Sequence, residues 1–162
     1  LENKNELNVP LVRVQSACYT AEIFRSLDCD CHAQLSTSQQ LIAKKGGLLI
    51  YMLVDGRGAG LLNKIKGMEL GFTHNLDTSE AYEFLGLKQD PREYDRVYDI
   101  LSYFKIEKIK LLTNNPRKVS KLENVGIRVT RIPLEIRSTF ESEPYLKTKA
   151  SKMGHMLSEF DT

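Results

Sequence analysis

The 162-residue sequence contains no tryptophan, only three cysteines and no long hydrophobic run. The longest apolar stretch, residues 47–54, is far shorter than the about 20 residues that a membrane-spanning helix needs. The first residues have neither the basic start nor the apolar stretch of a signal peptide. An odd number of cysteines also argues against a secreted disulfide scaffold. We therefore expect a cytoplasmic protein without a membrane segment.

The sequence also lacks a surplus of charge of either sign. Its 23 basic and 21 acidic residues give a net charge of +2, which is too balanced for a protein that binds nucleic acid polymers. Residues 105–121 nevertheless contain six basic residues and one acid. This local excess suits a small phosphorylated ligand, although a solvated surface is an equally common explanation.

The composition, 41% hydrophobic and 27% charged, predicts a folded domain, and we expect a single one over residues 1–162. Apolar and helical patterns alternate, which predicts a layered α/β/α domain with a mostly parallel, mixed sheet. The expected strands are 11–15, 48–54, 108–113 and 127–132, and the expected helices are 34–45, 61–70, 77–85, 92–104, 115–124 and 145–157. Segment 48–54 is almost continuously apolar, which is typical of a buried central strand.

The three cysteines lie within fourteen residues, at Cys18, Cys29 and Cys31. Three thiolates can hold one zinc ion and leave its fourth position open for water, as catalytic zinc sites do. Two alternatives fit the spacing as well. The cysteines could simply be reduced thiols, or His32 could complete a closed structural site.

Two segments are candidates for anion binding. The glycine-rich loop Asp55–Gly60 follows a predicted strand and precedes a helix, the place where α/β proteins bind anions. It matches neither a Walker loop nor a dinucleotide fingerprint, so a tight turn is the alternative. Residues 113–118 repeat the arrangement, with Asn115 as helix cap and Arg117 and Lys118 in the first turn.

Several blocks in order along residues 11–157 closely resemble the GTP cyclohydrolase II family of riboflavin biosynthesis. The blocks are R-V-Q-S-A-C at 13–18, S-L-D-C-D-C at 26–31, D-G-R-G-A-G-L-L-N-K at 55–64, D-T at 77–78, L-G at 85–86, D-P-R at 90–92, L-L-T-N-N-P-R-K at 111–118 and K-M-G-H at 152–155. The family reaction converts GTP and water to a diaminopyrimidinone ribosyl phosphate, formate and pyrophosphate. The resemblance thus implies a hydrolase that opens the guanine imidazole ring at C8.

The resemblance also implies roles for individual residues. Cys18, Cys29 and Cys31 would bind one zinc ion per chain, whose activated water attacks C8. Arg92 would act as the nucleophile that takes the nucleotidyl phosphate, and Asp90 as proton acceptor. The implied nucleotide contacts are Arg13, Val14, Gln15, Ser16, Ala17, Gln34, Asp55, Gly56, Arg57, Thr78, Thr113 and Lys118. Magnesium at the triphosphate and a homodimer are implied by the family alone.

The departures from the family pattern gather on the part of the site that handles the base. Gln15 and Ala17 replace a histidine and a glutamate, and Asp55 replaces a glutamate. Met68 stands in the substrate site where the family has a tyrosine that works in ring opening, and a thioether cannot donate a proton. GTP hydrolysis remains the expected reaction, and these departures add three alternatives: a formamide product, a different nucleotide substrate, or nucleotide binding without catalysis. Only twelve residues precede Arg13, whereas relatives carry a longer leading segment that contributes strands, so we expect this segment to be either absent or trimmed.

Overall fold

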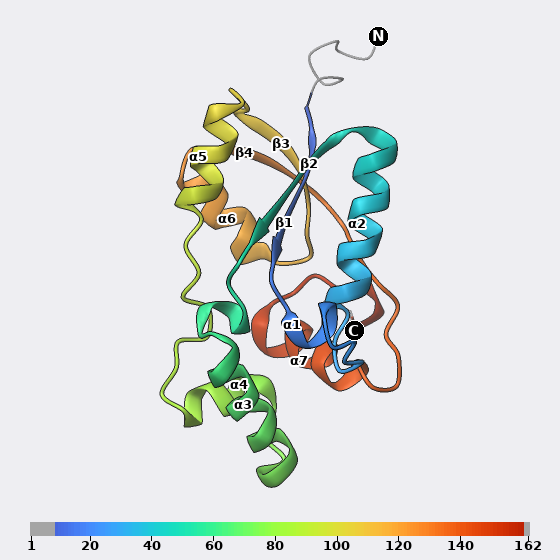
Figure 1. The fold of residues 1–162 in the computed structure, drawn as a ribbon, viewed down its shortest axis with the longest axis vertical. Coiled ribbons are helices and arrows are strands. Elements are labelled where there is room, and N and C mark those ends of the chain that lie inside the picture. Colours follow the sequence, from blue (N-terminus) through green and yellow to red (C-terminus); the bar gives the residue numbers. More distant parts are fainter. Residues whose placement is uncertain (1–8, 161–162) are drawn as a thin grey trace.

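A computed structural model describes residues 9–160 and contains one four-stranded sheet (Figure 1). The strands are β1 (Leu11–Ser16), β2 (Gly47–Met52), β3 (Lys108–Leu112) and β4 (Arg128–Ile132). Their spatial order is β2-β1-β3-β4, and every neighbouring pair is parallel. The predicted α/β class is confirmed, with a sheet that is wholly parallel in the part of the chain described.

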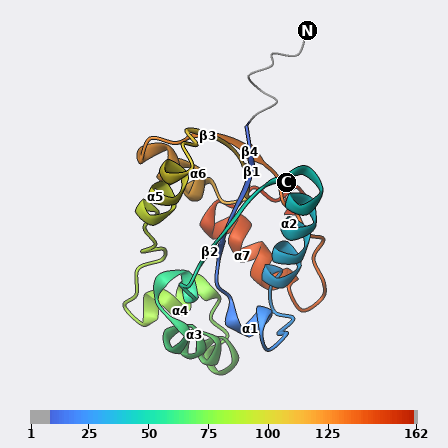
Figure 2. The ribbon, with the colours of Figure 1, turned by 45° about the horizontal axis from the view of Figure 1, so that its top comes forward.

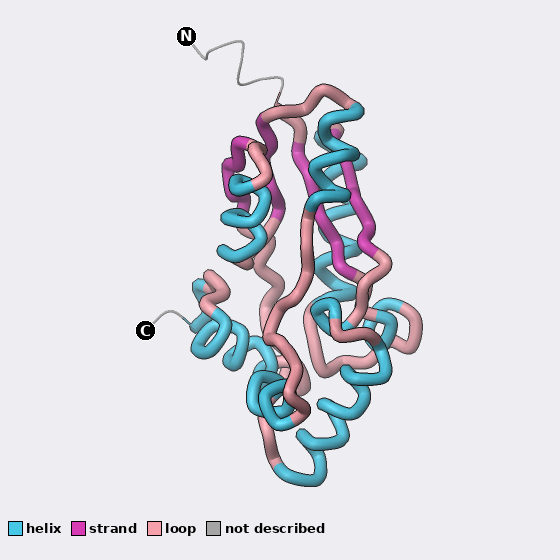
Figure 3. The backbone as a smooth tube through the Cα atoms, turned by 90° about the vertical axis from the view of Figure 1, so that its left-hand side faces the viewer, coloured by secondary structure: helices cyan, strands magenta, loops and turns pink. Residues whose placement is uncertain are grey.

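Helices cover both faces of this sheet, so the layered arrangement is also confirmed. Figure 2 shows α5 and α6 on one side of the strands and α2 on the other. The α-helices are α1 (Tyr19–Glu22), α2 (Cys31–Lys45), α3 (Leu61–His74), α4 (Thr78–Phe84), α5 (Asp95–Tyr103), α6 (Pro116–Asn124) and α7 (Glu143–Met153). Figure 3 shows the strands gathered in one half of the molecule and mainly helices and loops in the other.

The main core lies between the sheet and the α5/α6 face. Val12 and Val14 of β1 and Leu111 of β3 are fully buried there, together with Leu101 of α5 and Leu122 of α6. Burying one such side chain contributes about 1.5–3 kcal/mol. Because β1 and β3 are the two inner strands, this core fixes the positions at which their carboxyl ends meet.

The prediction of a buried central strand at residues 48–54 is wrong. The strand exists as β2, but it ends at Met52 and forms an edge of the sheet, and within residues 9–160 it pairs only with β1. Ile50 is its one buried residue, and Leu53 just beyond it is 77% exposed. A continuous apolar sequence can form a central strand covered on both faces or an edge strand with one face partly exposed. The sequence pattern alone does not distinguish these two positions.

The helix predicted at 92–104 begins three residues later. α5 starts at Asp95, so Arg92 lies in the loop that precedes the helix. Lys121 donates to the carbonyl oxygen of Arg92, so this backbone group is bonded to another helix. The change matters because a loop lets Arg92 fold back onto Asp90.

The other helix signals are confirmed within a few residues. Asp77 accepts hydrogen bonds from the backbone of Ser79 and Glu80 and opens α4 with a complete capping box. Asn115 caps α6, with Pro116 in its first turn. α7 ends earlier than predicted because Gly154 adopts a left-handed backbone with φ of 67°.

Among residues 9–160, no helix has both the length and the apolar character that crossing a membrane requires.

Candidate active site

A cavity of about 550 Å³ lies at the carboxyl edge of the sheet. In Figure 1 the arrows of β1 and β2 point toward the region where α1, α3, α4 and α7 gather. Ligands in open α/β sheets bind at this edge, in the crevice beyond the strand ends. Ser16 ends β1, Asp55 follows β2 and Thr113 follows β3, and all three line the cavity.

Almost all of the predicted site residues line this one cavity. The lining includes Arg13, Gln15, Ser16, Ala17, Cys18, Cys29, Cys31, Gln34, Asp55, Gly56, Arg57, Met68, Thr78, Arg92, Thr113 and Lys118. Val14 and Asp90 are the exceptions. Val14 is a core residue whose carbonyl oxygen accepts a hydrogen bond from Lys118, and Asp90 reaches the site through Arg92.

The three cysteines converge in the lining of the cavity. Their sulfur atoms all lie within 4.8 Å of one another, and Cys18 and Cys29 are 3.8 Å apart. Sulfurs at two corners of a tetrahedral zinc site with Zn–S bonds of about 2.3 Å would be about 3.8 Å apart. All three cysteines are free. The donor chemistry and the spacing therefore fit a zinc ion.

The Cys18 sulfur also has a cationic neighbour. Lys64 of α3 donates to it over 3.1 Å. Hydrogen bonds from Cys29 and Cys31, together with the Lys64 ammonium, hold the pKa of Cys18 well below its ordinary value. A thiolate is the form of cysteine that binds metal, so these contacts favour the form of Cys18 that a metal ion would need.

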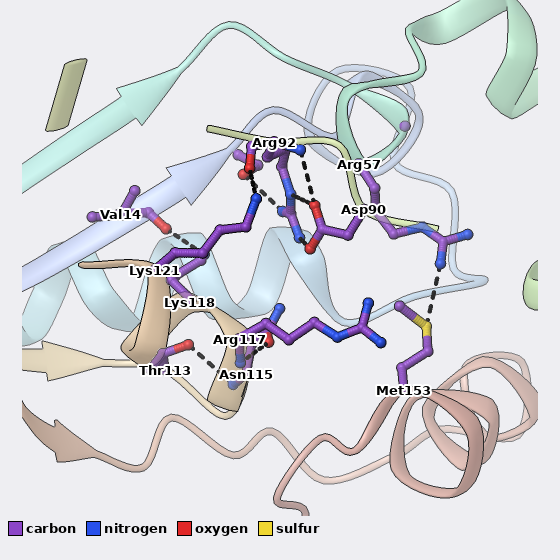
Figure 4. Close-up of polar contacts among 12 residues, drawn as sticks. Val14, Arg57, Asp90, Arg92, Thr113, Asn115, Arg117, Lys118, Lys121 and Met153 are labelled. Atoms are coloured by element: carbon purple, nitrogen blue, oxygen red, sulfur yellow. Dashed lines mark hydrogen bonds and ion pairs between the residues drawn. The ribbon is translucent and has the colours of Figure 1, made fainter. Parts of the chain in front are cut away.

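Arg92 and Asp90 form a two-point ion pair beside the end of β1 (Figure 4). Nε of Arg92 donates to Oδ1 of Asp90 over 2.7 Å, and Nη2 donates to Oδ2 over 2.6 Å. Nη1 donates to Ser16 Oγ over 3.0 Å. Burial alone would raise the pKa of Asp90, but Arg92 holds it below its ordinary value. Asp90 is therefore a carboxylate that fixes the guanidinium at the end of β1.

Lys118 completes the basic wall beside Arg92. Its ammonium is buried and donates to the carbonyl oxygen of Val14 over 2.8 Å (Figure 4). Burial, followed by the positive charges of Arg13 and Arg92, lowers the pKa of Lys118 well below its ordinary value. A negative charge brought into the cavity would favour the protonated lysine again. This wall is therefore built to receive an anion.

Basic residues also predominate around the cavity as a whole. Six lysines and arginines line it, against three acids. The basic residues are Arg13, Arg57, Lys64, Arg92, Lys118 and Lys149, and the acids are Asp28, Asp55 and Glu141. Of the basic cluster predicted at 105–121, Lys118 alone belongs to this lining, and the other five residues lie outside it.

The glycine-rich loop Asp55–Gly60 forms a tight turn beside the Arg92 segment and carries one arginine of the cavity lining. Its backbone N–H groups are used inside the loop, because Gly58 and Gly60 donate to the carbonyl oxygen of Asp55. A side chain at Gly58 would meet Pro91 and Arg92 at 3.1 and 3.3 Å, so this glycine allows the loop to approach the Arg92 segment. The tight-turn alternative thus describes the backbone of this loop.

Arg57 extends from the loop across the cavity. It donates to the sulfur of Met153 over 3.3 Å (Figure 4). It also donates to Thr78 Oγ1 over 2.9 Å and lies 4.0 Å above the ring of Tyr82. These contacts join the loop to α4 and α7. Figure 4 also shows Arg117 extending from α6 in the direction of Arg57 and Met153.

Sequence reasoning missed a buried cluster that α7 brings to the metal end. Lys149 donates to Asp30 over 3.1 Å, and its ammonium lies 4.4 Å from the ring of Tyr145. Asp30 stands between Cys29 and Cys31 and also accepts from Gln34, whose oxygen accepts from Arg13. The only sequence signal was Asp30 itself, an acid placed between two candidate ligands.

Two further residues of this region were given no site role. His155, just after α7, lines the cavity, and burial followed by the charge of Lys149 lowers its pKa to about 3. Lys121 of α6 donates to the carbonyl oxygen of Arg92 over 2.5 Å. Lys121 thereby fixes the backbone that carries the Arg92 side chain.

Comparison with known proteins gives a consistent result. The sequence model of the family "GTP cyclohydrolase II" matches residues 2–133. A GTP cyclohydrolase-2 of Shewanella frigidimarina is 46% identical over 152 residues, covering 93% of this chain and 75% of that protein. A GTP cyclohydrolase-2 of Shewanella sediminis is 44% identical over 158 residues, covering 96% and 77%. The Riboflavin biosynthesis protein RibBA of Chlorobium phaeovibrioides is 46% identical over 150 residues, covering 91% of this chain and 36% of that longer protein. The chain therefore belongs to the GTP cyclohydrolase II family, a family of hydrolases.

Proposed function

We propose that this protein is a zinc-dependent GTP cyclohydrolase that acts in riboflavin biosynthesis. It would hydrolyse GTP at C8 of the guanine ring and release pyrophosphate. One observation carries the proposal: a three-cysteine cluster and a buried basic wall face the same cavity. Ring hydrolysis needs an activated water at one end, and a triphosphate needs cations at the other.

The cysteine cluster would hold the zinc ion. Zinc bound by three protein ligands supplies an activated water at neutral pH. Cys18 follows the end of β1, Cys29 lies in the loop before α2, and Cys31 is the first residue of α2. All three residues line the cavity, so a ligand in the cavity could reach an ion held by them.

The basic wall would bind the triphosphate. Arg92 and Lys118 offer two cationic groups beside Ser16 and Thr113. Magnesium would neutralise part of the remaining negative charge of the triphosphate. Because Asp90 uses Nε and Nη2 of Arg92, Nη1 is the nitrogen directed toward Ser16 at the cavity. Asp90 is also placed to accept a proton from the guanidinium if Arg92 attacks phosphorus.

The base-handling end supports a second candidate function, hydrolysis that stops at the formamide. Met68 lines the cavity where the family tyrosine would stand. Tyr82 also lines the cavity, but its hydroxyl donates to the carbonyl oxygen of Gly56 over 2.9 Å. With a thioether at position 68, the proton-donating group that the resemblance implies for formyl release is missing from that position.

Mass spectrometry of the products tests both candidates. Zinc-loaded protein is incubated with magnesium and with GTP, ATP, CTP or UTP in turn. A diaminopyrimidinone ribosyl phosphate with free formate from GTP supports the full reaction, and its formamide supports the second candidate. A Met68→Tyr variant that converts a formamide product to formate would assign the difference to this one side chain.

A protein that binds nucleotide without chemistry is the remaining possibility. Saturable GTP binding with no pyrophosphate from any of the four nucleotides would identify it and refute the enzyme. We also propose the homodimer that the family implies, which sedimentation at several protein concentrations would test.

A further inference from the structure

Lys64 occupies an unusual position next to the cysteine cluster. Its ammonium lies 3.1 Å from Cys18 Sγ, 2.6 Å from Thr20 Oγ1 and 3.4 Å from Asp55 Oδ1. An ammonium group has three N–H donors, and these three acceptors match that number. The Lys64 side chain is only 16% exposed. These contacts therefore hold the Lys64 ammonium, mostly buried, against the sulfur of Cys18.

The other contacts hold the ammonium rather than compete for it. Asp55 is itself fixed, since Oδ2 accepts from the backbone N–H of Tyr19 over 2.8 Å and Oδ1 accepts from Gly56 over 2.5 Å. A side chain at Gly56 would meet Lys64 Cβ at 3.2 Å, so the glycine loop also limits where Lys64 can move. An ion pair with Asp55 alone would not require Lys64 to contact Cys18.

We propose that Lys64 is a positioning residue for the metal centre, donating an N–H···S hydrogen bond to the Cys18 thiolate while the metal is bound. The inference rests on the proposed zinc site. Three thiolates on a divalent ion leave one excess negative charge, and the Lys64 ammonium compensates it within the same pocket. The hydrogen bond would also hold the Cys18 sulfur in place, as outer-shell partners do at other metal sites.

Cobalt(II) is a suitable probe because its sulfur-to-metal charge-transfer band reports thiolate ligation directly. The purified full chain, freed of metal, is titrated with Co²⁺ in competition with a chelator. We expect Lys64→Met to weaken Co²⁺ binding by about ten- to a hundredfold and to shift the charge-transfer band. Lys64→Arg, which keeps a cationic donor, should restore part of the affinity.

Lys66 provides the matched control. It lies on the same helix, is exposed and does not line the cavity. Lys66→Met should bind Co²⁺ with the affinity and spectrum of the unmodified protein. Urea unfolding of each metal-free variant, with Lys64→Gln as a second replacement, separates an effect on the metal from a general loss of folding.

The outcomes distinguish this inference from the proposed function. If the unmodified protein shows no thiolate-to-cobalt band, the metal site itself is refuted, and the inference with it. If the band is present but Lys64→Met and Lys64→Gln fold and leave its energy and the Co²⁺ affinity unchanged, the inference alone is wrong. A raised KM for GTP with unchanged cobalt binding would then assign Lys64 to the substrate.

Discussion

Replacing Lys149 with methionine should destabilise the protein strongly, because it breaks a buried ion pair. The side chains of Lys149 and Asp30 are 11% and 2% exposed, and their charged atoms are 3.1 Å apart. After the substitution, Asp30 would keep the hydrogen bond from Gln34 but lose its countercharge. Leaving one buried charge without its partner typically costs about 3–5 kcal/mol.

Urea unfolding of the metal-free protein measures this cost. With a slope of about 2 kcal/mol per molar urea, the unfolding midpoint of Lys149→Met should fall by about 1.5–2.5 M. Lys147→Met is the control on the same helix. Its partner is Glu143, the two side chains are 60% and 41% exposed, and such a pair contributes about 0.3–0.5 kcal/mol.

A double substitution tests the cause. Asp30→Asn combined with Lys149→Met removes both charges. The double variant should therefore lose less free energy of unfolding than Lys149→Met alone. A Lys149→Met midpoint within the range of the Lys147→Met control would refute the reasoning. A double variant as unstable as the sum of the two single variants would refute it as well.

Three further predictions concern the site and the core. Asp90→Asn should slow pyrophosphate release from GTP about ten- to a hundredfold while cobalt binding stays unchanged, because Arg92 loses a charged partner but the cysteines do not; equal rates would contradict the role of the pair. His155 has a pKa lowered to about 3 by burial, so the unfolded chain binds the extra proton below about pH 6.5 and stability should fall as the pH drops from there. In His155→Gln the slope of unfolding free energy between pH 4 and 6 should be smaller by up to about 1.4 kcal/mol per pH unit, and an unchanged slope in urea titrations would refute this. Leu111→Ala should cost about 2–5 kcal/mol in the same assay, since Leu111 is fully buried in an inner strand, and a loss below about 1 kcal/mol would contradict its place in the core.

Local patterns in the sequence predicted the parts of the fold that depend on neighbouring residues. The capping box at Asp77 and the Asn115 cap with Pro116 are local hydrogen-bond and backbone preferences, and both are present. The cysteines converge because Cys29 and Cys31 are close in sequence and Cys18 follows the first strand. Their roles in binding a metal remain predictions.

Contacts between distant segments were beyond the reach of these patterns. Lys149 and Asp30 are 119 residues apart, and no local sequence pattern at either residue predicts their contact. The edge position of β2 depends on which strands pair, which an apolar run does not specify. The position of Arg92 in a loop also depends on Lys121, which is 29 residues away and donates to the carbonyl oxygen of Arg92.

Carbon-13 NMR of GTP labelled at C8, incubated with the zinc-loaded protein and magnesium, follows the carbon that the proposed reaction attacks. Attack at C8 moves the labelled carbon out of the aromatic ring, so we expect a new signal from formate or from a formamide, together with pyrophosphate. A labelled carbon that stays in the guanine ring through prolonged incubation, with zinc bound at the three cysteines, would contradict the proposed reaction.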